Sequence, residues 1–142
     1  MTTLVYDHNN HVIAYESRQI KDERIIITDS IEKLIVIDKH RFLGCGKVAD
    51  INLLIKAFLN KEPPDCDDLH AILWLIEDKH VRRIGFCDGM LWVNTLDYST
   101  AEGSGSEWAI AALDFGKSAK EAVEYAMTRD PFSGGKVRII EL

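Results

Sequence analysis

Cysteine is scarce in this 142-residue sequence, and Cys45, Cys66 and Cys87 are odd in number and far apart. A disulfide framework is therefore not expected, and the pattern favours a reducing compartment. No hydrophobic run approaches the roughly 20 residues of a membrane-spanning helix. The first residues also lack the basic segment and apolar segment of a secretory signal. We predict a cytoplasmic location and no membrane partner.

Positive charge is also in short supply, with 17 lysines and arginines against 23 acidic residues and a net charge of −6. This balance argues against nucleic acid as a partner. Metal-ligand patterns are weak as well: residues 65–70 mix hard and soft donors, and no histidine has another four residues along. We expect no metal and no cofactor. The length and the 46% hydrophobic content fit one globular domain, residues 1–142.

The first half of the sequence has the pattern of strands followed by a helix. Short β-prone runs predict strands at residues 3–6, 12–15, 24–28, 33–37 and 41–45. We expect the first two to pair as a hairpin and the next two to pair as a second one. From Val48 the period becomes helical, because Asn52, Lys56 and Asn60 form one polar stripe. The wide apolar remainder predicts a mostly buried helix over residues 48–59.

The second half repeats this order. Apolar runs predict strands at residues 71–76, 83–87 and 90–94, then a helix over 107–115 that ends at Gly116. Ser118 and Glu121 form a capping box that opens another helix, which Pro131 stops, and residues 136–141 form a last strand. Hairpin connections favour antiparallel sheets. The prediction is an α+β fold, a four-layer α-β-β-α sandwich of two mainly antiparallel sheets.

Five stretches of the sequence resemble motifs of the proteasome β-subunits and the bacterial proteasome-like peptidase. They occur in the same order and span nearly the whole chain: MTTLV (1–5), VIAYESR (12–18), EKL (32–34), FLGCGKVAD (42–50), and GSGS (103–106) with RDPFSGG (129–135). Each motif alone is weak, but their common order is fairly specific. The resemblance implies the N-terminal-nucleophile hydrolase fold.

The resemblance also implies that Thr2 is the catalytic nucleophile once Met1 is removed. A threonine hydroxyl needs a base, and the free α-amino group of the same residue can serve. Its ordinary pKa of about 7.7–8.0 suits a general base near neutral pH. Lys33 would be the cation beside the threonine oxygen. Taken without the resemblance, Thr2 is simply the start of an edge strand, and Lys33 a solvated residue.

Glu16 stands where the family has an aspartate that pairs with the lysine. The extra methylene is expected to shift Lys33 and to weaken activity, since about 1 Å of misplacement can cost ~10²-fold in rate. An alternative alignment places Ser17 at that position. Ile20 is a further departure, because the family commonly has a threonine beside the substrate there.

The remaining site residues are also implied by the resemblance. Gly46 would supply a backbone N–H to a developing oxyanion. Ser104, Asp130 and Ser133 would surround the amino terminus. Turn chemistry alone could also explain these glycine, serine and aspartate positions.

The leading interpretation is a threonine-type peptidase subunit that hydrolyses peptide bonds. The resemblance implies unfolded polypeptide or peptide substrates, a homo-oligomeric ring and a possible ATPase unfoldase partner. Two alternatives remain open: a catalytically silent relative with a structural or interaction role, and a non-peptidase amidohydrolase of the same fold.

Overall fold

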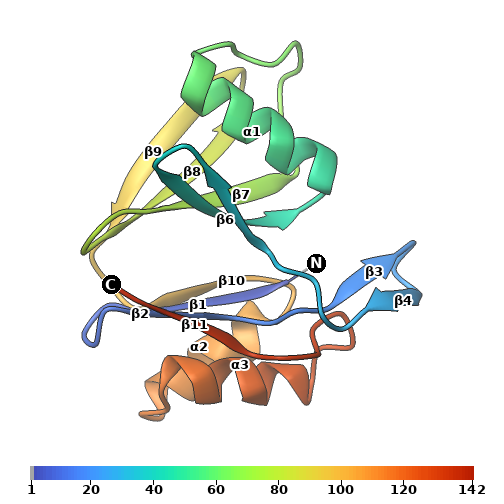
Figure 1. The fold of residues 1–142 in the computed structure, drawn as a ribbon, viewed down its shortest axis with the longest axis vertical. Coiled ribbons are helices and arrows are strands. Elements are labelled where there is room, and N and C mark those ends of the chain that lie inside the picture. The colour runs from blue at the N-terminus through green and yellow to red at the C-terminus, as the bar shows by residue number, and fades with distance from the viewer. Residues whose placement is uncertain (1) are drawn as a thin grey trace. The chain divides into compact units, whose positions relative to one another are not determined.

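The computed structural model describes residues 2–142, and their contacts divide them into two compact units. Unit 1 consists of the residues up to Lys33 together with Asp97–Leu142, and unit 2 consists of Leu34–Leu96 (Figure 1). In the sequence, unit 2 is therefore inserted into unit 1. The prediction of a single domain over residues 1–142 stays a prediction.

Unit 1 contains a four-stranded antiparallel sheet with the order β10-β1-β2-β11. Its strands are β1 (Thr3–Asp7), β2 (Val12–Tyr15), β10 (Thr100–Gly103) and β11 (Arg138–Glu141). Two helices, α2 (Ser106–Asp114) and α3 (Ala119–Met127), cover one face of this sheet (Figure 1). The expected 3–6/12–15 hairpin and both helices are confirmed, whereas β10 was not predicted.

Small side chains let the two helices approach the sheet closely. Val5 and Ala14 are register partners on β1 and β2, and they share a buried cluster with Ala109, Ala122 and Ala126 of the helices. The opposite face of the same two strands is buried too, through the following residues: Leu4, Tyr6, Ile13 and Tyr15. Because both faces are buried, the two central strands are hydrophobic almost throughout.

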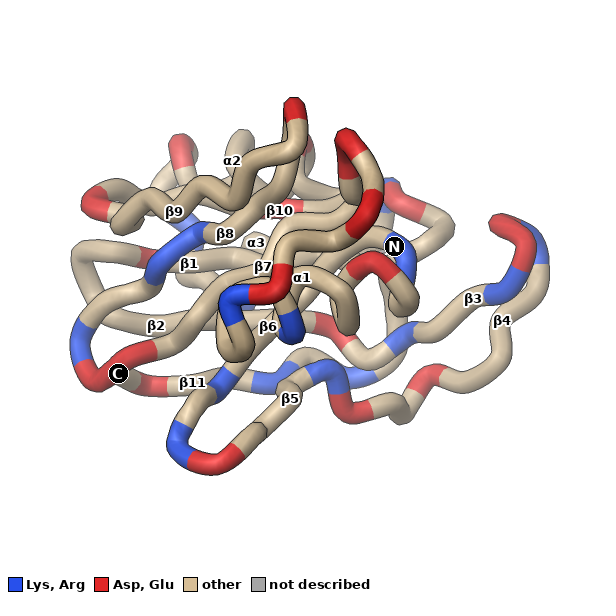
Figure 2. Tube along the Cα trace, turned by 90° about the horizontal axis from the view of Figure 1, so that it is seen from above, with Lys and Arg blue, Asp and Glu red and all other residues tan. Residues whose placement is uncertain are grey.

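A separate hairpin of β3 (Gln19–Lys21) and β4 (Ile25–Thr28) extends from unit 1 (Figure 1). Its tip carries both charge signs (Figure 2). The predicted pairing of residues 24–28 with 33–37 is wrong. Asp22 and Glu23 have positive φ angles of 53° and 55°, and such a turn closes a tight hairpin with the residues before it.

Unit 2 is a five-stranded antiparallel sheet with one helix. The strands lie in sequence order: β5 (Leu34–Ile37), β6 (His40–Gly46), β7 (Ala71–Ile76), β8 (Val81–Cys87) and β9 (Met90–Leu96). The helix α1 (Val48–Asn60) lies over one face of the sheet (Figure 1). Its Ile51, Leu54 and Ile55 join a buried cluster with Phe42 and Leu73.

The helix α1 is less completely buried than its apolar composition predicts. Asn52, Lys56 and Asn60 are exposed as expected, but Val48 and Leu53 are also 61% and 41% exposed. The fold class itself is confirmed, with antiparallel sheets and three helices in the described part of the chain. Among residues 2–142, no helix is long and apolar enough to cross a membrane.

Candidate active site

The side chains of Thr2, Glu16 and Lys33 meet within unit 1. The Lys33 Nζ donates a hydrogen bond to the Thr2 Oγ1 at 3.0 Å and forms a direct ion pair with the Glu16 Oε1. Thr2 is 4% exposed, Glu16 is fully buried, and the Lys33 side chain is 10% exposed. A cation therefore lies against the threonine oxygen in a site almost closed to water.

Backbone groups supply the other partners of Glu16. Its Oε1 accepts the N–H of Thr3 at 3.3 Å, and its Oε2 accepts the N–H groups of Arg18 at 2.9 Å and Gly134 at 3.0 Å. A buried carboxylate needs such partners because its charge has lost hydration. Lys33 reaches Glu16 and Thr2 together, so the additional methylene of glutamate does not separate the lysine from the threonine.

Ser17 makes contacts elsewhere. Its Oγ donates to the backbone oxygen of Asp29 at 2.6 Å and accepts the N–H of Lys136 at 2.6 Å. The sequence left open whether Glu16 or Ser17 occupies the position beside Lys33. In the structure it is Glu16 that contacts Lys33.

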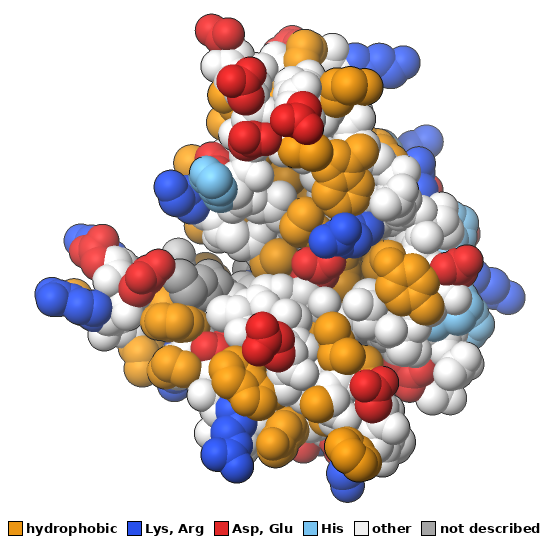
Figure 3. Space-filling model, turned by 180° about the vertical axis from the view of Figure 1, so that it is seen from behind, with side chains coloured by type: hydrophobic (Ala, Val, Ile, Leu, Met, Phe, Trp, Pro, Cys, Tyr) orange, Lys and Arg blue, Asp and Glu red, His pale blue; other side chains and the backbone are white. Residues whose placement is uncertain are grey.

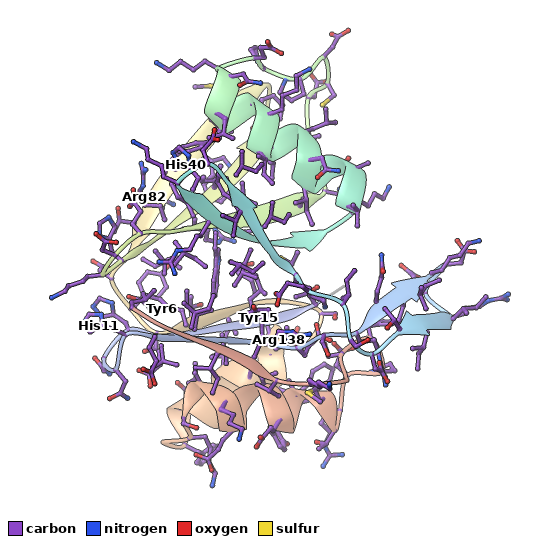
Figure 4. The ribbon with its side chains drawn as sticks, in the orientation of Figure 1. Tyr6, His11, Tyr15, His40, Arg82 and Arg138 are labelled. Carbon is purple, nitrogen blue, oxygen red and sulfur yellow. The ribbon has the colours of Figure 1, made fainter. Side chains whose placement is uncertain are left out.

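Glu32, which precedes Lys33, is held by residues of two neighbouring strands. The Tyr15 hydroxyl donates to the Glu32 Oε1 at 2.8 Å, and the Arg138 Nε lies 3.5 Å from its Oε2. Tyr15 and Arg138 are register partners on β2 and β11 (Figure 4). Burial, followed by the hydrogen bond to Glu32, raises the pKa of Tyr15. These contacts fix the chain immediately before Lys33.

A second group of polar side chains surrounds Asp130. Ser104 and Ser133 each donate a hydroxyl to the Asp130 Oδ2 at 2.6 Å, and the N–H of Phe132 donates to its Oδ1 at 3.0 Å. The Ser133 Oγ is also 2.7 Å from the Thr3 Oγ1. The structure thus brings Ser104, Asp130 and Ser133 together, next to the residue that follows Thr2.

Gly46 lies in unit 2, at the end of β6. It has a φ of 115°, and a Cβ added there would overlap the backbone of His70 and Ala71. Local packing therefore requires glycine at this position. Its assignment as the donor to an oxyanion stays a prediction. Cys45 beside it is buried, as expected for an apolar residue of the core.

Three contributors to the site could not be identified from sequence: Thr3, Arg18 and Gly134. All three donate a backbone N–H to Glu16, and such groups carry no signature in the side-chain pattern. The Arg18 guanidinium binds Asp29 through its Nε at 2.7 Å and one terminal nitrogen at 3.1 Å. This hydrogen bonding raises the pKa of Arg18 and lowers that of Asp29. A Cβ on Gly134 would overlap this guanidinium, so a larger residue there would displace the Arg18 side chain from its present position.

No three histidine, cysteine, aspartate or glutamate side chains in residues 2–142 gather as they would around a metal ion. The acidic residues 65–68 are exposed.

Comparison with known proteins gives matches at the level of structure. No protein-family model and no curated protein matches the sequence. Eukaryotic HslV from Trypanosoma brucei has a TM-score of 0.72 and 23% identity, with 99% of each chain covered. The chain has a proteasome-like fold. BPH of Thiobacillus denitrificans matches with a TM-score of 0.66 and 16% identity over 99% of this chain and 97% of that one.

BPH in complex with epoxomicin matches similarly, with a TM-score of 0.65 and 15% identity over 100% of this chain and 99% of that one. HslV is a proteasome-like N-terminal-nucleophile hydrolase and BPH is a bacterial proteasome homologue. The fold that the sequence motifs implied is therefore confirmed. At these identities the comparison establishes the fold and leaves the activity to be argued from the site.

Proposed function

We propose that this protein is a proteasome-like threonine-type peptidase subunit that hydrolyses peptide bonds once Met1 has been removed. One observation carries the proposal: the Lys33 ammonium group, anchored by buried Glu16, donates to the Thr2 Oγ1 at 3.0 Å. A cation at this distance stabilises the alkoxide form of the hydroxyl and so favours nucleophilic attack.

The free α-amino group of Thr2 would act as the general base. It takes the proton of the Oγ1 as this oxygen attacks the carbonyl carbon of the substrate, and it then protonates the departing amine. The resulting ester is hydrolysed by water, which restores the threonine hydroxyl. While Met1 is attached, the Thr2 nitrogen is an amide and has no basic lone pair, so the unprocessed chain should be inactive.

The test uses protein that mass spectrometry shows to begin at Thr2. We expect it to hydrolyse fluorogenic peptides, and we expect Thr2→Ala to reduce hydrolysis to background. Thr2→Ser keeps a hydroxyl and should retain measurable activity, which separates loss of the nucleophile from damage to the fold. Full activity of Thr2→Ala would disprove the assignment. No turnover by the processed wild type would favour a silent relative.

Epoxomicin offers a second probe, because the related BPH has been crystallised with it. We expect the processed chain to bind epoxomicin and the Thr2→Ala variant to bind it more weakly. The comparison can be made by the shift in thermal unfolding temperature with and without the compound.

Glu16→Asp tests the position of the carboxylate. Aspartate is shorter by one C–C bond, roughly 1.5 Å, so it cannot keep both Lys33 and the N–H groups of Arg18 and Gly134. We expect kcat to fall, because the lysine then loses its fixed position beside Thr2. An increase in kcat would instead show that glutamate misplaces the lysine.

The proposed partners follow from the likeness in fold. They are peptide or unfolded polypeptide substrates, further copies of this chain in a homo-oligomeric ring, and a possible ATPase unfoldase. Light scattering of the purified protein tests the second of these directly, and a purely monomeric species at micromolar concentration would contradict it.

A further inference from the structure

Thr3 makes a buried hydrogen bond that the predicted catalytic set does not include. Its Oγ1 lies 2.7 Å from the Ser133 Oγ, and Thr3 and Ser133 are 0% and 1% exposed. The distance is that of a good O–H···O hydrogen bond. Water cannot replace either partner at this level of burial, so the direction of the bond is set by neighbouring protein groups.

The environment of Asp130 determines which hydroxyl is the donor. The Ser133 Oγ donates to the Asp130 Oδ2 at 2.6 Å. A serine hydroxyl has one proton, and an ionised carboxylate can only accept. With its proton directed to Asp130, the Ser133 Oγ must accept the proton of the Thr3 Oγ1. The hydrogen bonds therefore run in one direction, from Thr3 to Ser133 to Asp130.

The backbone of Thr3 has a role in the other half of the site. Its N–H donates at 3.3 Å to the Glu16 Oε1, the same oxygen that pairs with Lys33. Thr3 is consequently bonded to both groups of polar residues, through its N–H to Glu16 and through its hydroxyl to Ser133. It is also joined directly to Thr2, so these two bonds fix the peptide that carries the proposed nucleophile.

The glycine at position 105 supports a fixed position for this hydroxyl. A Cβ on Gly105 would overlap the Thr3 Oγ1 and would lie 3.3 Å from the Asp130 Oδ2. Gly105 is buried, so the hydroxyl occupies space that only a glycine leaves open. The side chain of Thr3 is held on this side as well as by its hydrogen bond.

We infer that Thr3 is a positioning residue for the reaction, whose hydroxyl orients Ser133 and Asp130 relative to the amino end of Thr2. The inference rests on the proposed function. Under that function, Ser133 is one of the residues expected to surround the free amino group of Thr2, and without the Thr3 proton its oxygen would have an additional lone pair to offer to this group. Hydrogen bonding to the charged form raises the pKa of an amine. Loss of the hydroxyl should therefore make the α-amino group a base only at higher pH.

The experiment compares Thr3→Val with Thr3→Ser in protein that begins at Thr2. Valine has nearly the shape of threonine and suits a strand, but it has no donor. We expect Thr3→Val to lower kcat about tenfold while KM stays within about twofold, and Thr3→Ser to keep kcat within about threefold of wild type. The acid limb of the kcat/KM profile should move upward by roughly half a pH unit in Thr3→Val only.

A second measurement does not require turnover. Titration of the α-amino group by NMR should show a higher pKa in Thr3→Val than in wild type, and an unchanged one in Thr3→Ser. If wild type is active and depends on Thr2, but Thr3→Val keeps its kcat and its pH profile, the role of Thr3 is refuted while the proposed function stands. If no form turns over peptide, the proposed function fails, and the titration alone decides for or against Thr3.

Urea unfolding of each variant separates loss of fold from loss of positioning. Should Thr3→Val fail to fold, Thr3→Cys replaces it, because its S–H is only a weak donor. The same signs are then expected for kcat and for the pKa of the α-amino group, with serine again as the variant that restores them.

Discussion

Replacement of Glu16 by glutamine should destabilise the protein strongly, and the structure explains why. Glu16 is fully buried and pairs with Lys33, whose side chain is 10% exposed. Glutamine keeps the shape but removes the charge, so the lysine loses this carboxylate. In either orientation the amide NH₂ would also face donors: the N–H groups of Arg18 and Gly134 at the Oε2 position, or the Thr3 N–H and the Lys33 ammonium at the Oε1 position. Breaking a buried pair in this way costs about 3–5 kcal/mol.

Lys33→Met should cost less, about 2 kcal/mol, because Glu16 keeps three backbone N–H donors. In the double variant no charge of this pair remains. The double variant should therefore lose about 3 kcal/mol of unfolding free energy, which is less than the sum of the two single losses. The difference is a coupling energy of about 2–4 kcal/mol between Glu16 and Lys33.

Urea titrations of wild type, the two single variants and the double variant provide the measurement, with the same N-terminus in every protein. The slope of unfolding free energy against urea should stay constant, so that the differences report stability. Additive costs, or a Glu16→Gln cost below about 1 kcal/mol, would refute the description of a tightly coupled buried pair.

Three further predictions concern other parts of the protein. The pKa of the Tyr15 hydroxyl is raised in the folded protein. Above about pH 10 the unfolded chain therefore loses this proton before the folded protein does, and the stability of the wild type should fall. Tyr15→Phe should reduce that fall when urea titrations at about pH 8 and about pH 10.5 are compared. Ser118→Ala removes the capping box of α3 and should lower the free energy of unfolding by about 1 kcal/mol. Ser106 is the first residue of α2, whose N-cap, Gly105, makes no side-chain hydrogen bond. Ser106→Ala should therefore change the free energy of unfolding very little in the same assay. Phe115, the C-cap residue of α2, is 88% exposed, and Ile110 and Tyr125 of the two helices are 39% and 42% exposed. Figure 3 shows hydrophobic side chains of this kind exposed among charged ones. If these helices mediate self-association, Phe115→Ser should lower the mass measured by light scattering, and an unchanged mass would exclude this contact.

Local chemistry made parts of the fold predictable. The capping box at Ser118 and Glu121 is present as expected, with both reciprocal bonds. The polar stripe of α1 likewise predicted a helix over residues 48–59, which agrees to within one residue with the observed Val48–Asn60. These features depend on residues three or four positions apart, where a sequence pattern has direct physical meaning.

Pairing between strands was harder to predict. Residues 24–28 were assigned to the wrong partner because their pairing depends on a turn with two positive φ angles at Asp22 and Glu23, which are not the residues most typical of such turns. The preceding partner, β3, has only three residues and shows no clear alternation. Turn geometry decided the register here, and composition did not reveal it.

The side-chain members of the candidate site were identified more easily than its backbone members. Family-like motifs indicated Glu16 and Lys33, and the structure brings them into contact. The N–H of Gly134, separated from Glu16 by 118 positions, was not predicted, because any residue type carries this group. Thr3 was missed for a related reason: its hydroxyl matters only through a partner 130 positions away.

The long separation between the two ends of the site has a consequence for the timing of synthesis. A growing chain that contains Thr2, Glu16 and Lys33 must extend by about another 100 residues before Asp130, Ser133 and Gly134 exist. At the usual rates of about 5–20 residues per second, this takes on the order of 5–20 s. During that interval Glu16 lacks the Gly134 N–H and Thr3 lacks its acceptor. Under the proposed function, a ribosome-bound chain would therefore stay harmless to its neighbours until translation is almost finished.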